Sequence, residues 1–179
     1  HRWRHRGEIK NFIMSKYAIS LDDTTESQRQ VIENMYPLFI HDQWAYSDSQ
    51  PNKYGIINSA RNAIGSPAQS LAEQAEELSP YWNTPAHHHP FLIRVDEIPA
   101  GFCLVKSAPL APDGRDFHLD NFFLLHPFRR KGIGIQSTKL LVSHRPGSWV
   151  VDMKARNKPA HAFWTKVISE ISPHEFKES

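Results

Sequence analysis

The sequence has one cysteine and no long hydrophobic run, and each of these absences excludes a class of protein. Because Cys103 is alone, an internal disulfide framework is excluded and a reducing compartment is expected. No apolar run approaches the roughly 18 residues of a membrane-spanning helix, and no signal peptide is recognisable. We therefore expect a cytoplasmic protein without a membrane partner.

A large excess of charge of one sign is also lacking. The 21 Lys and Arg residues against 19 Asp and Glu residues give a formal net charge of +2, which does not predict nucleic acid as a partner. The chain of 179 residues contains no internal repeat and fits one domain. A function that needs positive charge must therefore depend on a local cluster of basic residues.

The first thirteen residues, HRWRHRGEIKNFI, are basic and have no clear apolar period. Met14, followed by SKYAISL, is typical of a natural start. We therefore expect residues 1–13 to be an upstream extension or an expression remnant outside the fold, and residues 14–179 to form a single domain.

The apolar pattern of the remaining chain predicts both helices and strands. Thr25 and Gln28 form a capping box ahead of an amphipathic helix that Pro37 should bend. Ser66 as N-cap and Pro67 in the first turn predict a second helix, which Ser79-Pro80 ends. The other predicted elements are strands over 16–21, 91–95, 101–105, 117–125 and 149–153, a loop over 47–58, and helices over 134–144 and 157–171.

The most informative stretch covers residues 116–134, DFHLDNFFLLHPFRRKGIG. An apolar strand passes into a basic turn, after which Gly132 and Gly134 open a helical pattern. Glycine permits positive φ and close backbone approach, and the unpaired amides of a helix's first turn attract anions. The stretch therefore predicts a phosphate-binding turn, for which a pyrophosphate is a suitable ligand.

Two polar residues interrupt the predicted strand. His118 and Asp120 are two positions apart, so they lie on the same face of a strand and can look into a site. They are candidate catalytic residues, although a polar strand end without a chemical role is an open alternative.

A dinucleotide-binding fingerprint is a competing interpretation of the same glycines. Gly132 and Gly134 precede Ser137, and the next predicted strand leads to Asp152, near the distance expected for a ribose-binding acid. In that fold, however, the first glycine follows its strand almost at once, whereas residues 126–131 intervene in this sequence. The third glycine is missing as well, so we disfavour this interpretation.

Two short motifs resemble those of one enzyme family. The segment RRKGIG, from Arg129 to Gly134, resembles the Q/R-x-x-G-x-G/A signature of the GNAT superfamily of acetyl-CoA dependent N-acetyltransferases. The segment from Asn157 to Trp164 resembles the family's N-x-x-A-x-x-L/F-Y motif. The resemblance covers residues 90–171 and is only topological over 15–89. It implies an α+β fold with a mixed, mostly antiparallel, splayed sheet flanked by about four helices.

The resemblance also implies acetyl-CoA as the cofactor. Pantetheine would pair with the backbone of residues 123–125, the pyrophosphate would lie on the amides of 130–134, and Asn157 would reach the pantetheine arm. The cofactor-binding residues implied in this way are Phe123, Leu124, Leu125, Arg129, Arg130, Lys131, Gly132, Ile133, Gly134 and Asn157. No metal is expected.

The implied reaction is direct attack of a primary amine, from a small-molecule or peptide acceptor, on the thioester. Trp164 stands where many family members carry a tyrosine, and an indole cannot serve as a proton-transferring acid at neutral pH. Either the thiolate leaves unprotonated or another group helps. Position alone nominates Asp120, with His118 beside it on the same face, as a base that acts directly or through water. The alternative is a non-catalytic acyl-CoA binding module that has lost this chemistry.

Two further features remain outside the motifs. Family members usually continue into another strand pair after the last helix, but this chain ends in the polar segment SPHEFKES, so the pair is missing or truncated. A second subunit could cover the sheet edge, which makes a homodimer one expectation. The adjacent histidines His87, His88 and His89 cannot all face one ion, so they predict a substrate-facing loop rather than a metal site.

Overall fold

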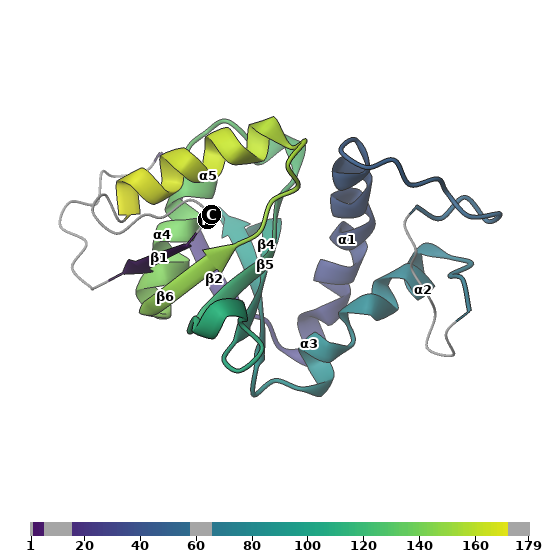
Figure 1. Ribbon diagram of the computed structural model, residues 1–179, viewed down its shortest axis with the longest axis horizontal. Coiled ribbons are helices and arrows are strands. Elements are labelled where there is room, and N and C mark those ends of the chain that lie inside the picture. The colour runs from purple at the N-terminus through teal and green to yellow at the C-terminus, as the bar shows by residue number, and fades with distance from the viewer. Residues whose placement is uncertain (1, 6–15, 58–65, 172–179) are drawn as a thin grey trace. The chain divides into compact units, whose positions relative to one another are not determined.

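The computed structural model describes residues 2–5, 16–57 and 66–171. The chain divides into two compact units, His1–Thr24 with Ala86–Ser179 and Thr25–Pro85, and each unit is described by itself. The first unit holds a six-stranded sheet in the order β1-β6-β5-β4-β3-β2 (Figure 1). Its strands are β1 (Arg2–His5), β2 (Ile19–Asp23), β3 (His88–Val95), β4 (Ile98–Ser107), β5 (Phe117–Leu124) and β6 (Gly147–Val151).

The sheet is mixed and mostly antiparallel, as predicted. Among the described strands, only the β5–β6 pair is parallel. Strands β3 and β4 form the predicted hairpin, and its turn residues Asp96 and Glu97 have φ angles of 49° and 65°. Positive φ at both positions is the geometry of a two-residue type I′ turn, whose twist matches that of the strands it joins.

His88 and His89 lie in a strand, so the prediction of an irregular loop is wrong for them, whereas His87 lies in the turn before it. Strand β3 begins at His88 rather than at Phe91. The strand was predicted to start after Pro90, because proline is disfavoured in a central strand. In the structure, Pro90 lies inside β3, opposite Leu104.

Helices α4 (Ile133–His144) and α5 (Lys158–Ile171) pack against one face of this sheet (Figure 1). Both were predicted within one residue of their observed starts, because their apolar side chains recur at helical spacing. The Lys139 Nζ of α4 lies 2.9 Å from Glu170 Oε2 of α5 and ties the two helices at their surface. The fully buried core residues of this layer include Phe91, Ile93, Cys103, Val105, Ile133, Leu141, Trp149, Val167 and Ile168.

Strand β1 comes from the segment that was expected to lie outside the fold. Arg2–His5 pair antiparallel with residues 147–150 of β6 and cover that edge. A strand held by backbone pairing needs no apolar pattern, which is why the sequence did not indicate it. Whether residues 1–13 are an extension, whether 14–179 form one domain and whether the chain dimerises remain predictions. The expected loss of a C-terminal strand pair concerns residues 172–179, which lie outside the described residues.

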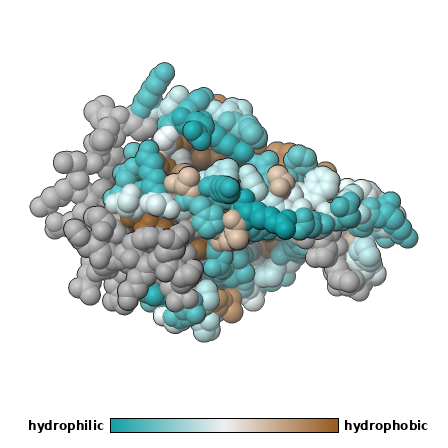
Figure 2. Space-filling view, turned by 45° about the horizontal axis from the view of Figure 1, so that its top comes forward, coloured by the Kyte–Doolittle hydropathy of each residue, from teal (hydrophilic) through white to brown (hydrophobic). Residues whose placement is uncertain are grey.

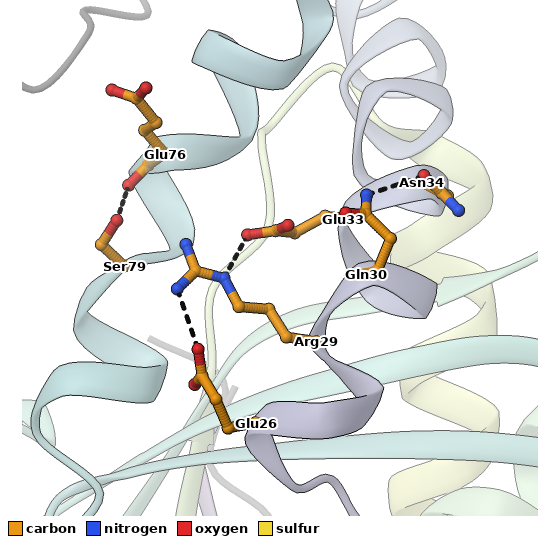
Figure 3. A network of polar contacts seen from close by, with 7 residues as sticks. All are labelled: Glu26, Arg29, Gln30, Glu33, Asn34, Glu76 and Ser79. Carbon is orange, nitrogen blue, oxygen red and sulfur yellow. Dashed lines mark hydrogen bonds and ion pairs between the residues drawn. The ribbon is translucent and has the colours of Figure 1, made fainter.

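The second unit is built around α1 (Arg29–Trp44), which continues through Pro37. The predicted capping box is confirmed, since the Thr25 backbone N–H donates to Gln28 Oε1 at 3.2 Å. One turn later, Arg29 pairs with Glu26 at 3.3 Å and with Glu33 (Figure 3). These contacts fix the start of α1.

The next helix begins later than predicted. Its N-cap is Ser70, whose hydroxyl accepts from the Glu73 N–H at 3.2 Å, rather than Ser66. The earlier segment stays non-helical because the Ala68 carbonyl accepts from Asn52 Nδ2 at 2.8 Å. Pro80 starts a short helix instead of ending one, since proline is favoured in a first turn. The observed elements are α2 (Leu71–Ala75), the 3₁₀ turn Glu76–Leu78 and α3 (Pro80–Asn83).

The surface carries its large hydrophobic side chains at separate places. Figure 2 shows small brown patches set among hydrophilic residues on the face in view. Among the described residues, no helix is both long and apolar enough to span a bilayer. The large hydrophobic residues that are exposed are Leu38, Tyr54, Leu71, Ile98 and Leu110.

Candidate active site

The parallel strands β5 and β6 separate after Leu119 of β5. They pair only at Phe117 with Trp149, His118 with Val150, and Leu119 with Val151. Strand β5 nevertheless continues to Leu124. From residue 120 to 124 its backbone therefore has no β6 partner, and we call the point after Leu119 the fork.

Hydrogen bonds and ring stacking hold β5 and β6 together at their paired end, before the fork. One Asp116 carboxylate oxygen accepts from both the backbone N–H and the hydroxyl of Ser148, each at 2.7 Å. The rings of Phe117 and Trp149 stack with centroids 4.8 Å apart, and Trp149 is fully buried. These contacts fix where the strands can begin to separate.

A β-bulge sits at the fork itself. In the β4–β5 ladder, Leu104 pairs with Asn121 and Val105 pairs with Leu119, which leaves Asp120 as the extra residue on β5. A bulge bends its strand and redirects a side chain, and bulges are frequent beside active sites. At this bulge the Asp120 side chain lies close to that of His118.

Four ionisable side chains gather at the fork. His118 Nδ1 lies 3.9 Å from Asp120 Oδ1, so the structure brings together the two residues that were predicted to share a face. Asp120 Oδ2 lies 2.9 Å from Lys106 Nζ, and His118 Nε2 lies 3.1 Å from Asp152 Oδ2. The His118 side chain is 11% exposed, whereas that of Asp152 is 73% exposed.

The side chains of His118 and Asp152 lie close together, but their atoms are not aligned for a hydrogen bond. Within the described part of the chain, His118 Nε2 is buried and has no hydrogen-bond partner, despite the carboxylate at 3.1 Å. The two facts agree because an ion pair requires only proximity, whereas a hydrogen bond also requires direction.

Sequence reasoning missed the roles of Lys106 and Asp152 at this place. Asp152 was considered only as a ribose-binding acid in a disfavoured fold. Its approach to His118 depends on the β5–β6 register, in which the start of β5 pairs with the end of β6. Lys106 could not have been placed, since its position opposite His118 depends on the β4–β5 register.

The basic turn follows the open end of β5 directly. Arg130 has a φ of 61° and Gly132 a φ of 77°, and both are exposed. Gly132 is the N-cap of α4, and the first intrahelical bond runs from Gln136 N to Gly132 O at 3.1 Å. The amides of residues 133–135 therefore have no acceptor within the helix, which is an arrangement that binds anions.

The basic side chains of this turn differ in their surroundings. Arg129 bends back to donate from Nε to the Leu124 carbonyl at 2.7 Å, and its guanidinium lies 5.3 Å from the Phe123 ring centre. It fastens the turn to the end of β5. Arg130 and Lys131 are exposed, and the Lys131 Nζ lies 6.0 Å from the Tyr17 ring centre.

The two glycines of the motif are required for different reasons. A Cβ on Gly132 would meet nothing within 4 Å, so its need for glycine comes from the positive φ. A Cβ on Gly134 would lie 3.0 Å from two ring carbons of Phe163, so glycine there allows α4 to approach α5. Gly134 is thus explained by helix packing as well as by any ligand.

The second motif lies at the start of α5. Asn157 is 7% exposed, and its Oδ1 accepts from the Ala160 N–H at 3.0 Å, so it caps the helix as predicted. Trp164 is buried, and its ring contacts those of Phe122 and Phe163 with centroids 5.4 and 4.9 Å apart. Trp164 therefore packs in the core.

The histidines 87–89 are engaged in the sheet. His88 is buried, and His89 Nε2 lies 3.1 Å from the Ser107 hydroxyl. In the residues that the structure describes, no three His, Cys, Asp or Glu side chains are grouped to hold a metal ion.

Comparisons with solved structures identify the fold. An acetyltransferase from Thermus thermophilus aligns with a TM-score of 0.60 and 15% identity, over 86% of this chain and 87% of that chain. The aminoglycoside N-acetyltransferase AAC(6')-Iy, solved with the bisubstrate analogue CoA-S-monomethyl-acetylneamine, aligns with a TM-score of 0.55 and 13% identity, over 90% of this chain and 98% of that chain. A ribosomal-protein-alanine N-acetyltransferase from Brucella melitensis biovar Abortus aligns with a TM-score of 0.52 and 15% identity, over 84% and 90%.

No protein-family model matches the chain, and no curated protein matches it in sequence. At identities this low, the structural likeness concerns the fold. The predicted GNAT-like architecture is confirmed, and this likeness assigns no role to an individual residue.

Proposed function

We propose that this chain, which has the fold of the GNAT acetyltransferases, binds acetyl-CoA and transfers its acetyl group to a primary amine. The observation that carries the proposal is the open end of β5. Its unpaired backbone leads directly into a turn whose amides can hold phosphate groups. The solved neighbour that was crystallised with a CoA-linked bisubstrate analogue supports the same ligand class.

The residues of this region suit coenzyme A in three respects. The backbone of residues 123–125 can hydrogen-bond the amides of an extended pantetheine arm, as an added strand would. The open amides at 130–134 can hold the pyrophosphate, with Arg130 and Lys131 adding positive charge. Asn157 uses Oδ1 for the helix cap, which leaves its Nδ2 donors for pantetheine. Arg129 acts here by fastening the turn to Leu124.

Acetyl-CoA supplies an activated acetyl thioester, and the fork supplies the groups that manage the proton. An amine that attacks as a nucleophile must first give up a proton, which His118 or Asp120 can accept directly or through water. Trp164 lies in the core and carries only an indole N–H, so it does not protonate the leaving thiolate.

The charge at the fork favours a cationic acceptor. Asp120 and Asp152 contribute two carboxylates, and Lys106 offsets one of them. A small-molecule or peptide amine that is protonated in solution would be attracted to this place before it loses its proton. The neighbours include enzymes named for aminoglycosides and for the alanine of a ribosomal protein, so both classes belong in a substrate panel.

Binding and turnover test the proposal separately. We expect calorimetry to show acetyl-CoA binding, and a thiol reagent to detect free CoA when neamine, an alanine-starting peptide or a linear polyamine is added. Cys103 should not interfere, because burial strongly raises the pKa of its thiol and the side chain is fully buried.

The outcomes distinguish the proposed acetyltransferase from the alternative of a non-catalytic module. Binding without thiol release across the panel would favour the non-catalytic acyl-CoA binding module. Absence of acetyl-CoA binding would contradict both functions.

A further inference from the structure

His118 lies between two carboxylates that have different surroundings. Asp120 faces its Nδ1 at 3.9 Å and is paired with Lys106 at 2.9 Å. Asp152 faces its Nε2 at 3.1 Å and comes from the other branch of the fork. The two branches of the fork therefore converge on one imidazole.

We propose that His118 is the group that takes the proton from the attacking amine, and that Asp152 is a positioning residue that orients its ring. This inference rests on the proposed acetyl transfer and names the base for it. In this arrangement Asp120 and Lys106 form a neutral pair that shapes the site beside the ring.

The geometry assigns a role to each ring nitrogen. A neutral imidazole donates from one nitrogen and accepts at the other. Nε2 is buried against Asp152, so it is suited to carry the hydrogen and donate it to that carboxylate. Nδ1 then accepts, on the side of the partly exposed Asp120. Its 3.9 Å distance from Asp120 Oδ1 suits an amine or a water that approaches from the side and donates to both atoms.

The step balances when both protons of the amine are followed. The ammonium form of the acceptor transfers one proton to Nδ1, which leaves a neutral amine and an imidazolium. The positive ring then lies between the carboxylates of Asp152 and Asp120. The amine nitrogen then forms the C–N bond as the C–S bond of the thioester breaks, and the second proton that the nitrogen sheds goes to the departing thiolate, directly or through water, to give the free thiol. The imidazolium afterwards returns its proton to solvent. Asp152 is 73% exposed, so its carboxylate can turn to align with Nε2 when a ligand fills the fork.

Charged side chains of both signs lie beside His118. Asp152 and Asp120 place negative charge next to the ring, whereas Lys106 places positive charge beside Asp120. His88 pairs with Lys106 in the next strand, so it belongs to the same row of the sheet.

The test follows the His118 ring by NMR and needs no ligand. In the free protein, the ring resonances that vanish in His118→Gln are assigned to His118, and their ¹⁵N shifts are compared in wild type, Asp152→Asn and Asp23→Asn at one pH. Asp23 is a matched control because its side chain is 76% exposed and lies 3.2 Å from Arg145, away from the fork. We expect the Nε2 shift to move in Asp152→Asn, because the carboxylate that faces this nitrogen is lost, and to stay in place in Asp23→Asn.

A kinetic arm distinguishes positioning from structural support. With the amine of the panel that turns over fastest, Asp152→Asn should lower kcat about tenfold and move the acid limb of the pH profile to lower pH, with an unchanged KM for acetyl-CoA. Asp152→Glu should return the acid limb of the pH profile to its wild-type position, because glutamate restores the carboxylate. His118→Gln should lower kcat about 100-fold.

The failure of this inference differs from failure of the proposed function. If wild type turns over while Asp152→Asn changes neither the ring ¹⁵N shifts nor the acid limb, the inference is overturned and acetyl transfer stands. If wild type binds acetyl-CoA but never turns over, both are overturned.

Discussion

The two ends of the β5–β6 pair have opposite character. Before the fork, Asp116 is bound to Ser148 and the fully buried Trp149 stacks on Phe117. After it, β5 has no β6 partner, and the carboxylates of Asp120 and Asp152 are partly exposed. Stability is concentrated at the paired end, whereas groups that can bind and react lie at the fork, where His118 is the last polar residue of the paired end, and along the open end.

This difference explains how one strand can serve both purposes. An open strand edge inside a sheet leaves backbone groups that need a partner. The paired end holds β5 rigidly enough for the open end to keep its shape without one. We therefore expect substitutions at the paired end to change folding, and substitutions at the open end to change binding.

The largest effect should come from the paired end. Trp149→Ala removes a fully buried ring and its stacking on Phe117, so it should lower the free energy of unfolding by about 3–5 kcal/mol. Asp152→Ala, on the exposed side of the fork, should change it by less than about 0.5 kcal/mol. Urea unfolding followed by fluorescence measures the free energy of unfolding of both variants. An equal decrease in the two would contradict the proposed difference between the paired end and the fork.

The Asp116 carboxylate should have the next largest effect. Asp116→Ala leaves the buried Ser148 without the acceptor for its N–H and hydroxyl, so we expect a loss of about 1–2 kcal/mol. Acetyl-CoA affinity measured below the unfolding transition should stay the same. A large loss of affinity in this variant would mean that the two ends are not independent.

The glycine of the basic turn should link a moderate stability cost to a binding defect. Gly132→Ala places a side chain at φ 77°, which costs about 1 kcal/mol, and should weaken acetyl-CoA binding several-fold by disturbing the open amides. Gly114→Ala is the matched control, because Gly114 has φ 65°, has equal space around it and lies outside the turn. If both variants bind acetyl-CoA equally well, the turn does not hold the phosphates.

The smallest effect concerns pH. Burial, and then the charge of Arg145, lower the pKa of His89 below its ordinary value of 6.5. As pH falls, His89 is therefore protonated in the unfolded chain before it is protonated in the folded chain. The contribution of neutral His89 to the free energy of unfolding is complete above about pH 6.5 and declines as pH falls through that value. His89→Gln should make the decline between pH 7.5 and 5.5 slightly shallower in urea unfolding. An unchanged slope would contradict the role of His89.

Much of the fold was predictable because its signals are local. The hairpin of β3 and β4, the strand β5 and the helices α4 and α5 follow from short apolar patterns and turn residues. Strand β1 and the late start of α2 depend instead on distant partners, namely β6 and Asn52. No local pattern carries such information.

The site was predictable in part for the same reason. The turn from Arg129 to Gly134 and the nearness of His118 to Asp120 are local features of one stretch. The bulge at Asp120, the contact of Lys106 and the approach of Asp152 depend on strand register and on where β6 ends. The packing of Gly134 against Phe163 likewise required the position of α5.

The central claim is that coenzyme A binds along the open end of β5 and at the basic turn. Titrating ¹⁵N-labelled protein with CoA and following backbone amide shifts tests it most directly. We predict large changes at residues 120–125 and 130–135 and almost none at 116–119 and 147–150. Saturable binding with its changes confined to the paired end, or elsewhere than these open segments, would contradict the claim.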